Sequence, residues 1–258
     1  ARVGLLDRLI QHARATAEFS VYYGRGRDGY DVRGRVAHES LFNAANGSYR
    51  GPNSQQGYSP FTTWTRGLAW AMLGFAEQLE FLDTVDDDSL TSHGGRAAVE
   101  QWMLDAACAT SDYYMEIAAS DGIPYWDSGA PNLEPVDSSA AAIGAQGLLR
   151  LARILEAAGR QPEADLYRQA GLRVVETLFE ETGPYLSTDS KHQGLILHSV
   201  YHWPNRWDHV PEGATTPRGE SSQWGDYHAR EAALYVQRLA CNGPYLAFFG
   251  GDRVQAAA

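Results

Sequence analysis

Apolar residues recur at helical spacing through most of this chain, with polar residues and helix breakers between the segments. In the first segment the apolar positions are Val3, Leu5, Leu6, Leu9, Ile10 and Ala13. Spacings of three and four residues place such positions on one face of a helix. The pattern predicts helices over residues 3–19, 62–83, 94–119, 137–158, 162–181, 193–201 and 222–240, and only weak alternating segments suggest strands. The chain is expected to be all-α.

Single residues support some of these boundaries. Asp137 carries an oxygen that can accept an N–H group at a helix start, and Pro162 suits a first turn, where its missing N–H costs nothing. Gly159 is placed to end the helix between them. The polar stretch 23–58 predicts a long loop, and long loops in compact domains are often functional.

Three predicted helix starts share a mixture of aromatic, polar and small residues. They lie at residues 64–70, 137–141 and 224–227. Similar starts along a chain of helices predict a ring of helical hairpins, in which helix starts gathered at one end line a common pocket. A solenoid is less favoured, because the helices share no fixed period of about 34 or 40 residues.

Length and charge narrow the possible classes. With 258 residues, the chain can bury one substantial core, so residues 1–258 are expected to form a single domain. A net charge of −11 argues against a nucleic-acid partner, and no apolar run is long enough to cross a membrane. An anionic sugar stays possible, because it needs only a few cationic or donor groups inside a pocket.

The cysteines bear on the compartment. Cys108 and Cys241 are isolated, which predicts core positions more readily than a disulfide or a metal site, and favours the cytoplasm over the periplasm. The chain opens at Ala1 without a signal-like apolar segment, so a signal peptide cannot be assessed.

The loop leading into the helix predicted from residue 62 is the segment richest in candidate chemistry. It and the helix start carry His38, Asn43, Asn46, Asn53, Gln55, Gln56, Arg66 and Trp70. Such a set suits a sugar, since pyranose faces stack on indoles, hydroxyls bind amides and a carboxylate fits the guanidinium fork. The structural alternative is that Trp64 and Trp70 are core residues, that Arg66 forms a surface ion pair and that the amides cap turns.

The order of the motifs favours the sugar-binding interpretation. His38, then Gln56-Gly57-Tyr58-Ser59, then Trp64-Thr65-Arg66-Gly67-Leu68-Ala69-Trp70 follow one another, with further motifs at residues 124–127, 137–143, 197–202 and 219–228. The whole series resembles glycoside hydrolase family 88, the unsaturated glucuronyl hydrolases. The resemblance covers nearly the whole chain and corresponds to the C-terminal two-thirds of the family's domain. Leu68 departs from it, because the family usually has Gln there, which puts fine substrate preference in doubt.

The resemblance implies a six-hairpin (α/α)6 barrel, incomplete at the N-terminus of this chain. It implies an enzyme that removes 4,5-unsaturated uronic acid from lyase-generated oligosaccharides of the glycosaminoglycan type, without a cofactor. In that reaction an Asp protonates C4, water adds at C5 and the hemiketal opens to release the neighbouring sugar. The alternatives are an unsaturated rhamnogalacturonyl hydrolase, a catalytically silent sugar-binding fragment, and an incomplete barrel that needs a second chain to finish it. The oligomeric state is left open.

Carried over by position, the resemblance assigns binding of the unsaturated uronate to His38, Gln56, Arg66 and Trp70. Arg66 would contact the carboxylate and Trp70 would form a stacking wall. Tyr201 and His202 are expected at the rim. The family's catalytic Asp is expected before Ala1, so no catalytic residue is assigned within the chain.

Other acids and histidines have simpler interpretations. Asp137 is predicted to be an N-cap residue, and Asp127 and Asp226 structural acceptors at helix starts facing the pocket. The series His192, His198 and His202 has intervals of six and four, which do not share one helical face, so no metal site is predicted.

Overall fold

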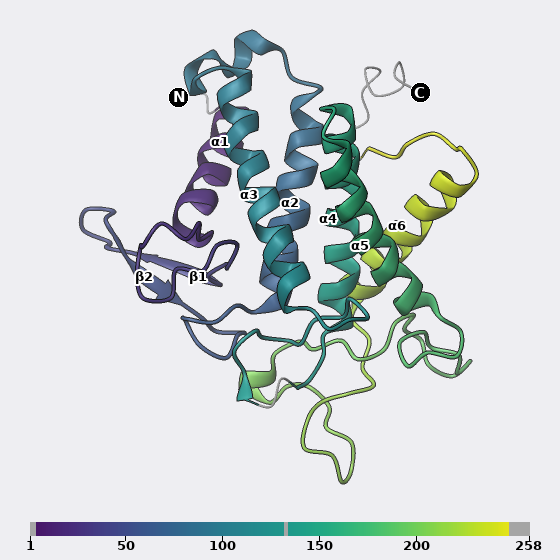
Figure 1. Cartoon of the computed structure of the whole chain (residues 1–258). Helices are drawn as coiled ribbons and strands as arrows, with labels where there is room; N and C mark the ends of the chain where they lie inside the picture. Colours follow the sequence, from purple (N-terminus) through teal and green to yellow (C-terminus); the bar gives the residue numbers. More distant parts are fainter. Residues whose placement is uncertain (1–3, 132–133, 248–258) are drawn as a thin grey trace.

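The computed structural model describes residues 4–131 and 134–247 (Figure 1). The helices are α1 (Leu5–Ala15), α2 (Thr65–Leu82), α3 (Arg96–Ile117), α4 (Ser138–Ala157), α5 (Gln161–Phe179) and α6 (Gln223–Ala240). A π-helical turn (Thr16–Ser20) follows α1, and short 3₁₀ helices lie at Asp87–His93 and Trp203–Asn205. The predicted mostly helical fold is confirmed; Val3, in the first predicted helix, lies outside the described residues.

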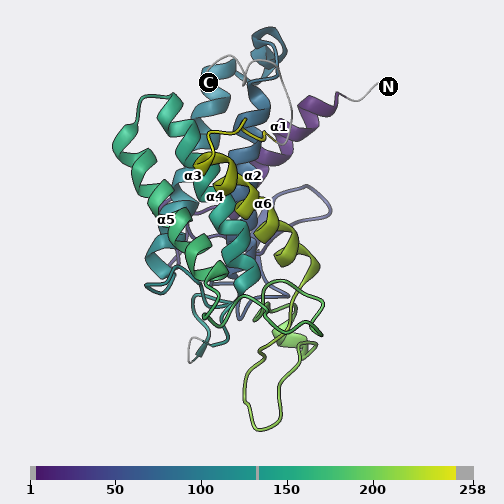
Figure 2. The ribbon, with the colours of Figure 1, turned by 90° about the vertical axis from the view of Figure 1, so that its right-hand side faces the viewer.

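Helices α2 and α4 form the centre of the packing. They lie against each other, α3 packs on α2, and α5 and α6 both pack on α4 (Figures 1 and 2). Gly147 permits the close approach of the two central helices, because a Cβ atom there would lie 3.0 Å from the backbone nitrogen of Leu73. Most of the apolar side chains of these helices fill one core, in which Met72, Met103 and Leu148 are fully buried.

The predicted boundaries of α4 and α5 are confirmed. The Asp137 carboxylate accepts the backbone N–H of Ser139, as an N-cap residue does. Gly159 has a φ of 73° just beyond the end of α4, where a left-handed residue closes a helix. Pro162 lies in the first turn of α5.

The predicted long loop at residues 23–58 contains a hairpin. Strand β1 (Glu39–Phe42) pairs antiparallel with β2 (Tyr49–Asn53), and the rings of Phe19, Phe42 and Tyr49 pack together beside it. The side-chain oxygens of Asn43 and Asn46 each accept a backbone N–H two residues ahead, so these amides cap the turn. The sequence pattern indicates these strands only weakly.

The prediction of a helix over residues 193–201 is wrong. The segment is irregular, with Ile196 bridged to Leu186 and His198 at a φ of 69°. The carboxylate of Asp226 accepts the backbone N–H groups of Leu195 and Ile196 at 2.8 and 3.0 Å. The tertiary structure therefore satisfies these donors from the first turn of α6, and the apolar spacing reflects burial instead of helical periodicity.

Two further expectations concern membrane-spanning segments and the two cysteines. None of the described helices is both long and apolar enough to cross a membrane. Cys108 is buried and Cys241 is exposed, and neither forms a disulfide. The expected core position therefore holds for Cys108 and is wrong for Cys241.

Candidate functional site

The starts of α2, α4 and α6 lie at the same end of the packed helices, where the long connections of the chain gather (Figures 1 and 2). Side-chain contacts join all three starts. The guanidinium of Arg66 on α2 reaches Asp137 before α4, and its Cζ atom lies 4.9 Å from the ring centroid of Trp224 on α6. This junction is the candidate site.

Arg66 is the centre of the junction and is only 4% exposed. Its Nη2 donates to the carbonyl oxygens of Val200 at 2.8 Å and Tyr201 at 2.6 Å, and its Nε lies 3.4 Å from Asp137 Oδ2. The guanidinium also lies over the ring of Trp64, at 4.5 Å. Three N–H groups of the guanidinium are thereby engaged, and the indoles of Trp64 and Trp224 both lie against it.

Nη1 of Arg66 remains available. No residue within 4–131 or 134–247 accepts a hydrogen bond from it. Burial lowers the pKa of the guanidinium, while the charge of Asp137 opposes this shift. A guanidinium that is held rigidly and has donors to spare is suited to bind a carboxylate.

His38 lies beside this arginine. Its Nδ1 faces the backbone N–H groups of Gln55 and Gln56 at 3.1 and 3.3 Å, so Nδ1 is an acceptor and the neutral ring carries its proton on Nε2. Burial lowers the pKa of His38, the charge of Glu39 opposes this, and Arg66 lowers it further. His38 is therefore a neutral imidazole with one N–H group to donate.

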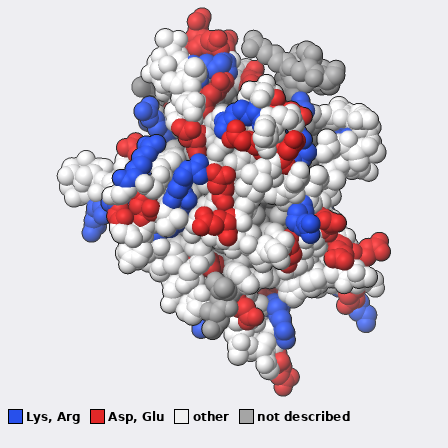
Figure 3. All heavy atoms as spheres, in the orientation of Figure 1, with Lys and Arg blue, Asp and Glu red and all other residues white. Residues whose placement is uncertain are grey.

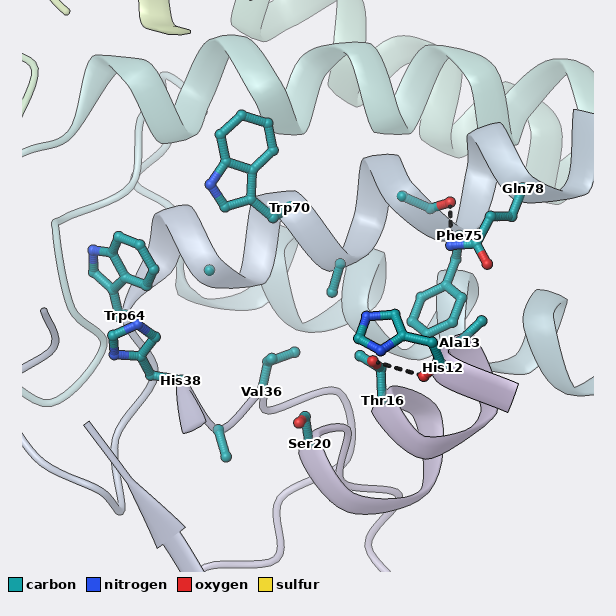
Figure 4. Close-up of a pocket in the computed structure, with 14 residues that line it drawn as sticks. His12, Ala13, Thr16, Ser20, Val36, His38, Trp64, Trp70, Phe75 and Gln78 are labelled. Atoms are coloured by element: carbon teal, nitrogen blue, oxygen red, sulfur yellow. Dashed lines mark hydrogen bonds between the residues drawn. The ribbon is translucent and has the colours of Figure 1, made fainter. Parts of the chain in front are cut away.

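A pocket of about 380 Å³ opens next to these groups (Figure 4). His38, Trp64 and Trp70 line one end of it, with the rings of His38 and Trp64 4.6 Å apart, and His12 and Phe75 line the other. An imidazole donor and indole surfaces around a cavity of this size suit a sugar ring.

Comparisons with known proteins agree with this chemistry. An unsaturated glucuronyl hydrolase from Bacillus sp. (strain GL1) is 30% identical over 204 residues, which are 78% of this chain and 46% of that protein. An unsaturated chondroitin disaccharide hydrolase from Streptococcus pyogenes serotype M1 is 27% identical over 70% of this chain and 39% of its own. The crystal structure of the unsaturated glucuronyl hydrolase from Bacillus sp. GL1 matches 88% of this chain and 50% of its own, with 28% identity and a TM-score of 0.65.

The chain is therefore similar to unsaturated glucuronyl hydrolases over most of its own length. The predicted α/α-barrel fold class is confirmed by the structural match. The chain spans about half the length of the relatives that it matches, a smaller share than the expected two thirds. No family model matches the sequence.

The predicted uronate-binding residues differ in their access to the pocket. His38 and Trp70 line the pocket, and Trp70 is 38% exposed, whereas Arg66 is buried and does not belong to its lining. Gln56 is half-buried, and its Oε1 is closed off from solvent without a hydrogen-bond partner among the described residues, so a ligand hydroxyl reaches this oxygen only after the side chain turns. The alternative that Arg66 forms a surface ion pair is wrong, because its partner Asp137 is also buried.

The two residues expected at the rim differ from each other. Tyr201 is exposed and its ring contacts those of Trp207 and Trp224, as a rim residue can. His202 is buried, and its Nδ1 has no partner among the described residues. The carboxylate of Asp208 accepts the backbone N–H groups of both, which fixes this bend of the chain.

The three internal acids are engaged in holding loops. Asp127 accepts the N–H groups of Tyr58 and Gly129, Asp137 those of Ser139 and Val200, and Asp226 those of Leu195 and Ile196. Burial raises the pKa of Asp127, although these hydrogen bonds lower it. The structural roles predicted for the three carboxylates are confirmed.

Sequence reasoning missed two contributors to the site. Trp224 stacks on Arg66 and donates from its indole N–H to Ser139 Oγ at 3.1 Å. The available signal was that Trp224 begins the predicted helix start at residues 224–227, which resembles the starts at residues 64–70 and 137–141. Asp208, which anchors the bend at Tyr201, had none, because its partners are backbone groups whose position depends on the fold.

Charge and metal ligands add little to the site. Acidic and basic side chains are interspersed over the face shown in Figure 3. Within residues 4–131 and 134–247, no group of three or more His, Cys, Asp or Glu side chains is arranged to hold a metal ion.

The lowered pKa of His38 predicts a dependence of stability on pH. The unfolded chain binds the proton more readily, so His38 contributes stability that is fully present above its ordinary pKa near 6.5 and is lost as pH falls through the lower folded pKa. We expect the free energy of unfolding to fall less between pH 7 and pH 4.5 in His38→Asn than in the unsubstituted chain. Urea unfolding at pH 7 and at pH 4.5 measures the free energy of unfolding of the variant and of the unsubstituted chain. Parallel pH profiles would show that His38 does not titrate differently on folding.

Proposed function

We propose that the protein removes a terminal 4,5-unsaturated uronic acid from oligosaccharides produced by polysaccharide lyases, and that this chain supplies the contacts to the uronate. The relatives named above act on unsaturated glucuronyl and chondroitin disaccharide substrates, as their names state. The glycosaminoglycan type of substrate is therefore the first choice.

The observation that carries the proposal is the state of Arg66. Its guanidinium is held by two backbone carbonyls and by Asp137, and Nη1 has no acceptor among the described residues. A uronate carboxylate is the feature that distinguishes this sugar from a neutral one, and an arginine already fixed in place loses little conformational entropy on binding it.

The neighbouring groups match the rest of the sugar. The Nε2–H group of neutral His38 can donate to a hydroxyl. Gln56 Oε1 is buried and unpartnered among the described residues, and it can accept from a hydroxyl once its side chain turns toward the sugar. Trp70 offers an exposed indole face to the apolar side of the ring. The acid that protonates C4 is assigned to none of Asp127, Asp137 and Asp226, because each is already committed to backbone donors.

Two measurements on the same preparation test the proposal. An unsaturated chondroitin disaccharide and its saturated counterpart are titrated into the protein by calorimetry, and loss of the ultraviolet absorbance of the C4–C5 double bond is followed. We expect binding that favours the unsaturated sugar, and decay of the absorbance. Absence of both binding and decay would contradict the proposal.

A second candidate function is sugar binding without turnover. It is favoured by the engagement of every acid named above at the junction. Binding of the unsaturated disaccharide with a constant absorbance would select this second function.

A further inference from the structure

The indole of Trp70 rests against the ring of His228 on α6. The two ring centroids lie 5.1 Å apart at an interplanar angle of 72°, an edge-to-face contact, and this is the ring contact that Trp70 makes within residues 4–131 and 134–247. His228 is 9% exposed, whereas Trp70 is 38% exposed and lines the pocket. The imidazole therefore backs an indole whose other side is open.

The orientation of His228 is fixed from α4. Its Nδ1 lies 2.6 Å from Gln146 Oε1, while Gln146 Nε2 donates to Glu231 Oε2 at 3.1 Å. Because a carboxylate can only accept, the amide nitrogen must face Glu231 and the amide oxygen must face the imidazole. Nδ1 of His228 is therefore the donor, and its proton is specified by the network.

The chain of contacts continues to a buried cation. Arg150, which is 3% exposed, lies 3.8 Å from Glu231 and forms an ion pair with Glu80 at 2.7 Å. Burial and the positive charge of Arg150 lower the pKa of His228 to about 4, so its ring is neutral near pH 7. A neutral ring keeps Nδ1 as its one N–H donor, which the bond to Gln146 uses.

We propose that His228 is a positioning residue for Trp70: held by Gln146, it fixes the indole as the wall on which the unsaturated sugar stacks. The use of that wall rests on the proposed function, whereas the contact itself does not. His228 acts through Trp70 and touches no reacting atom. Its loss leaves the indole free to rotate into the pocket, so sugar binding pays the entropy of ordering it.

The test measures the indole directly. Quenching of tryptophan fluorescence by iodide is recorded for the unsubstituted chain and for Trp70→Phe, and the difference reports Trp70. The same difference is measured in the backgrounds His228→Ala and His228→Phe, with His209→Ala as a control at an exposed loop histidine. We expect greater quenching of Trp70 in His228→Ala, a smaller change in His228→Phe, which keeps a ring at this position, and none in His209→Ala.

The affinity for the unsaturated disaccharide is then measured in a double-mutant cycle of His228 and Trp70. We expect His228→Ala to weaken binding roughly tenfold in the Trp70 background and much less in Trp70→Phe, since a positioning effect needs its target. Unchanged quenching of Trp70 in His228→Ala, or equal weakening in both backgrounds, would overturn the inference. If the unsubstituted chain binds no disaccharide, the proposed function fails, and the quenching still decides whether His228 holds the indole. Circular dichroism of each variant excludes misfolding as the cause.

Discussion

Replacing Arg66 with lysine is expected to weaken binding of the unsaturated disaccharide by roughly 10- to 150-fold, which corresponds to the about 1.5–3 kcal/mol that a hydrogen bond to a charged group contributes. Lysine keeps the positive charge but has no planar fork, so it cannot hold the two carbonyl oxygens and still present a second N–H group to a carboxylate. Calorimetric titration with the disaccharide measures the loss.

The comparison needs a control for stability, because Arg66 also neutralises the buried Asp137. Urea unfolding of Arg66→Lys shows whether the fold is kept. Arg160→Lys serves as the matched control, since Arg160 lies in an exposed pair with Glu163 and far along the chain from the site. Unchanged affinity in Arg66→Lys, with the fold intact, would remove Arg66 from the uronate contact.

The largest loss of stability is expected at Arg150. Its guanidinium lies among Glu77, Glu80 and Glu231, with the nearest oxygen, on Glu80, at 2.7 Å. Arg150→Met leaves these carboxylates without their cation inside the contact of α2, α4 and α6, and breaking a buried pair in this way costs about 3–5 kcal/mol. Urea unfolding at pH 7 measures the change in the free energy of unfolding.

Two comparisons identify the cause of that loss. Arg173→Met removes an exposed arginine paired with Glu176 at 3.8 Å, and we expect a change of about 0–1 kcal/mol there. Burial already raises the pKa of Glu80, with Arg150 opposing, so in Arg150→Met this carboxyl should take up a proton and the deficit should shrink as pH falls. A deficit that is independent of pH would point to lost packing of the side chain.

Local chemistry explains which predictions held. Asp137, Gly159 and Pro162 act within a few residues of their own helix ends, so their roles did not depend on the rest of the fold. The predicted helix at 193–201 failed because its apolar positions face a core shared with other segments, and its N–H groups are satisfied by Asp226. Periodicity alone cannot separate those two sources of apolar spacing.

Some features of the site likewise follow from the sequence, and others do not. Motif order singled out His38, Gln56, Arg66 and Trp70. The structure places His38 and Arg66 against the same ring, that of Trp64, and puts His38 and Trp70 on one pocket. The order of the motifs does not indicate that Arg66 is buried, or that His202 lies inside the protein instead of at the rim of the site. Burial depends on what other helices cover, which is a property of the assembled fold.

The sequence by itself determined the helical class, most helix ends and the set of residues suited to an acidic sugar, because these depend on residue type and spacing over short stretches. Only the tertiary structure decided which donors remain available. The carbonyls of Val200 and Tyr201 occupy one end of Arg66, and Gln146 sets the proton of His228, across more than 80 residues of chain. Such pairings arise where segments meet in space, and a hydrogen bond used there is one that a substrate cannot use.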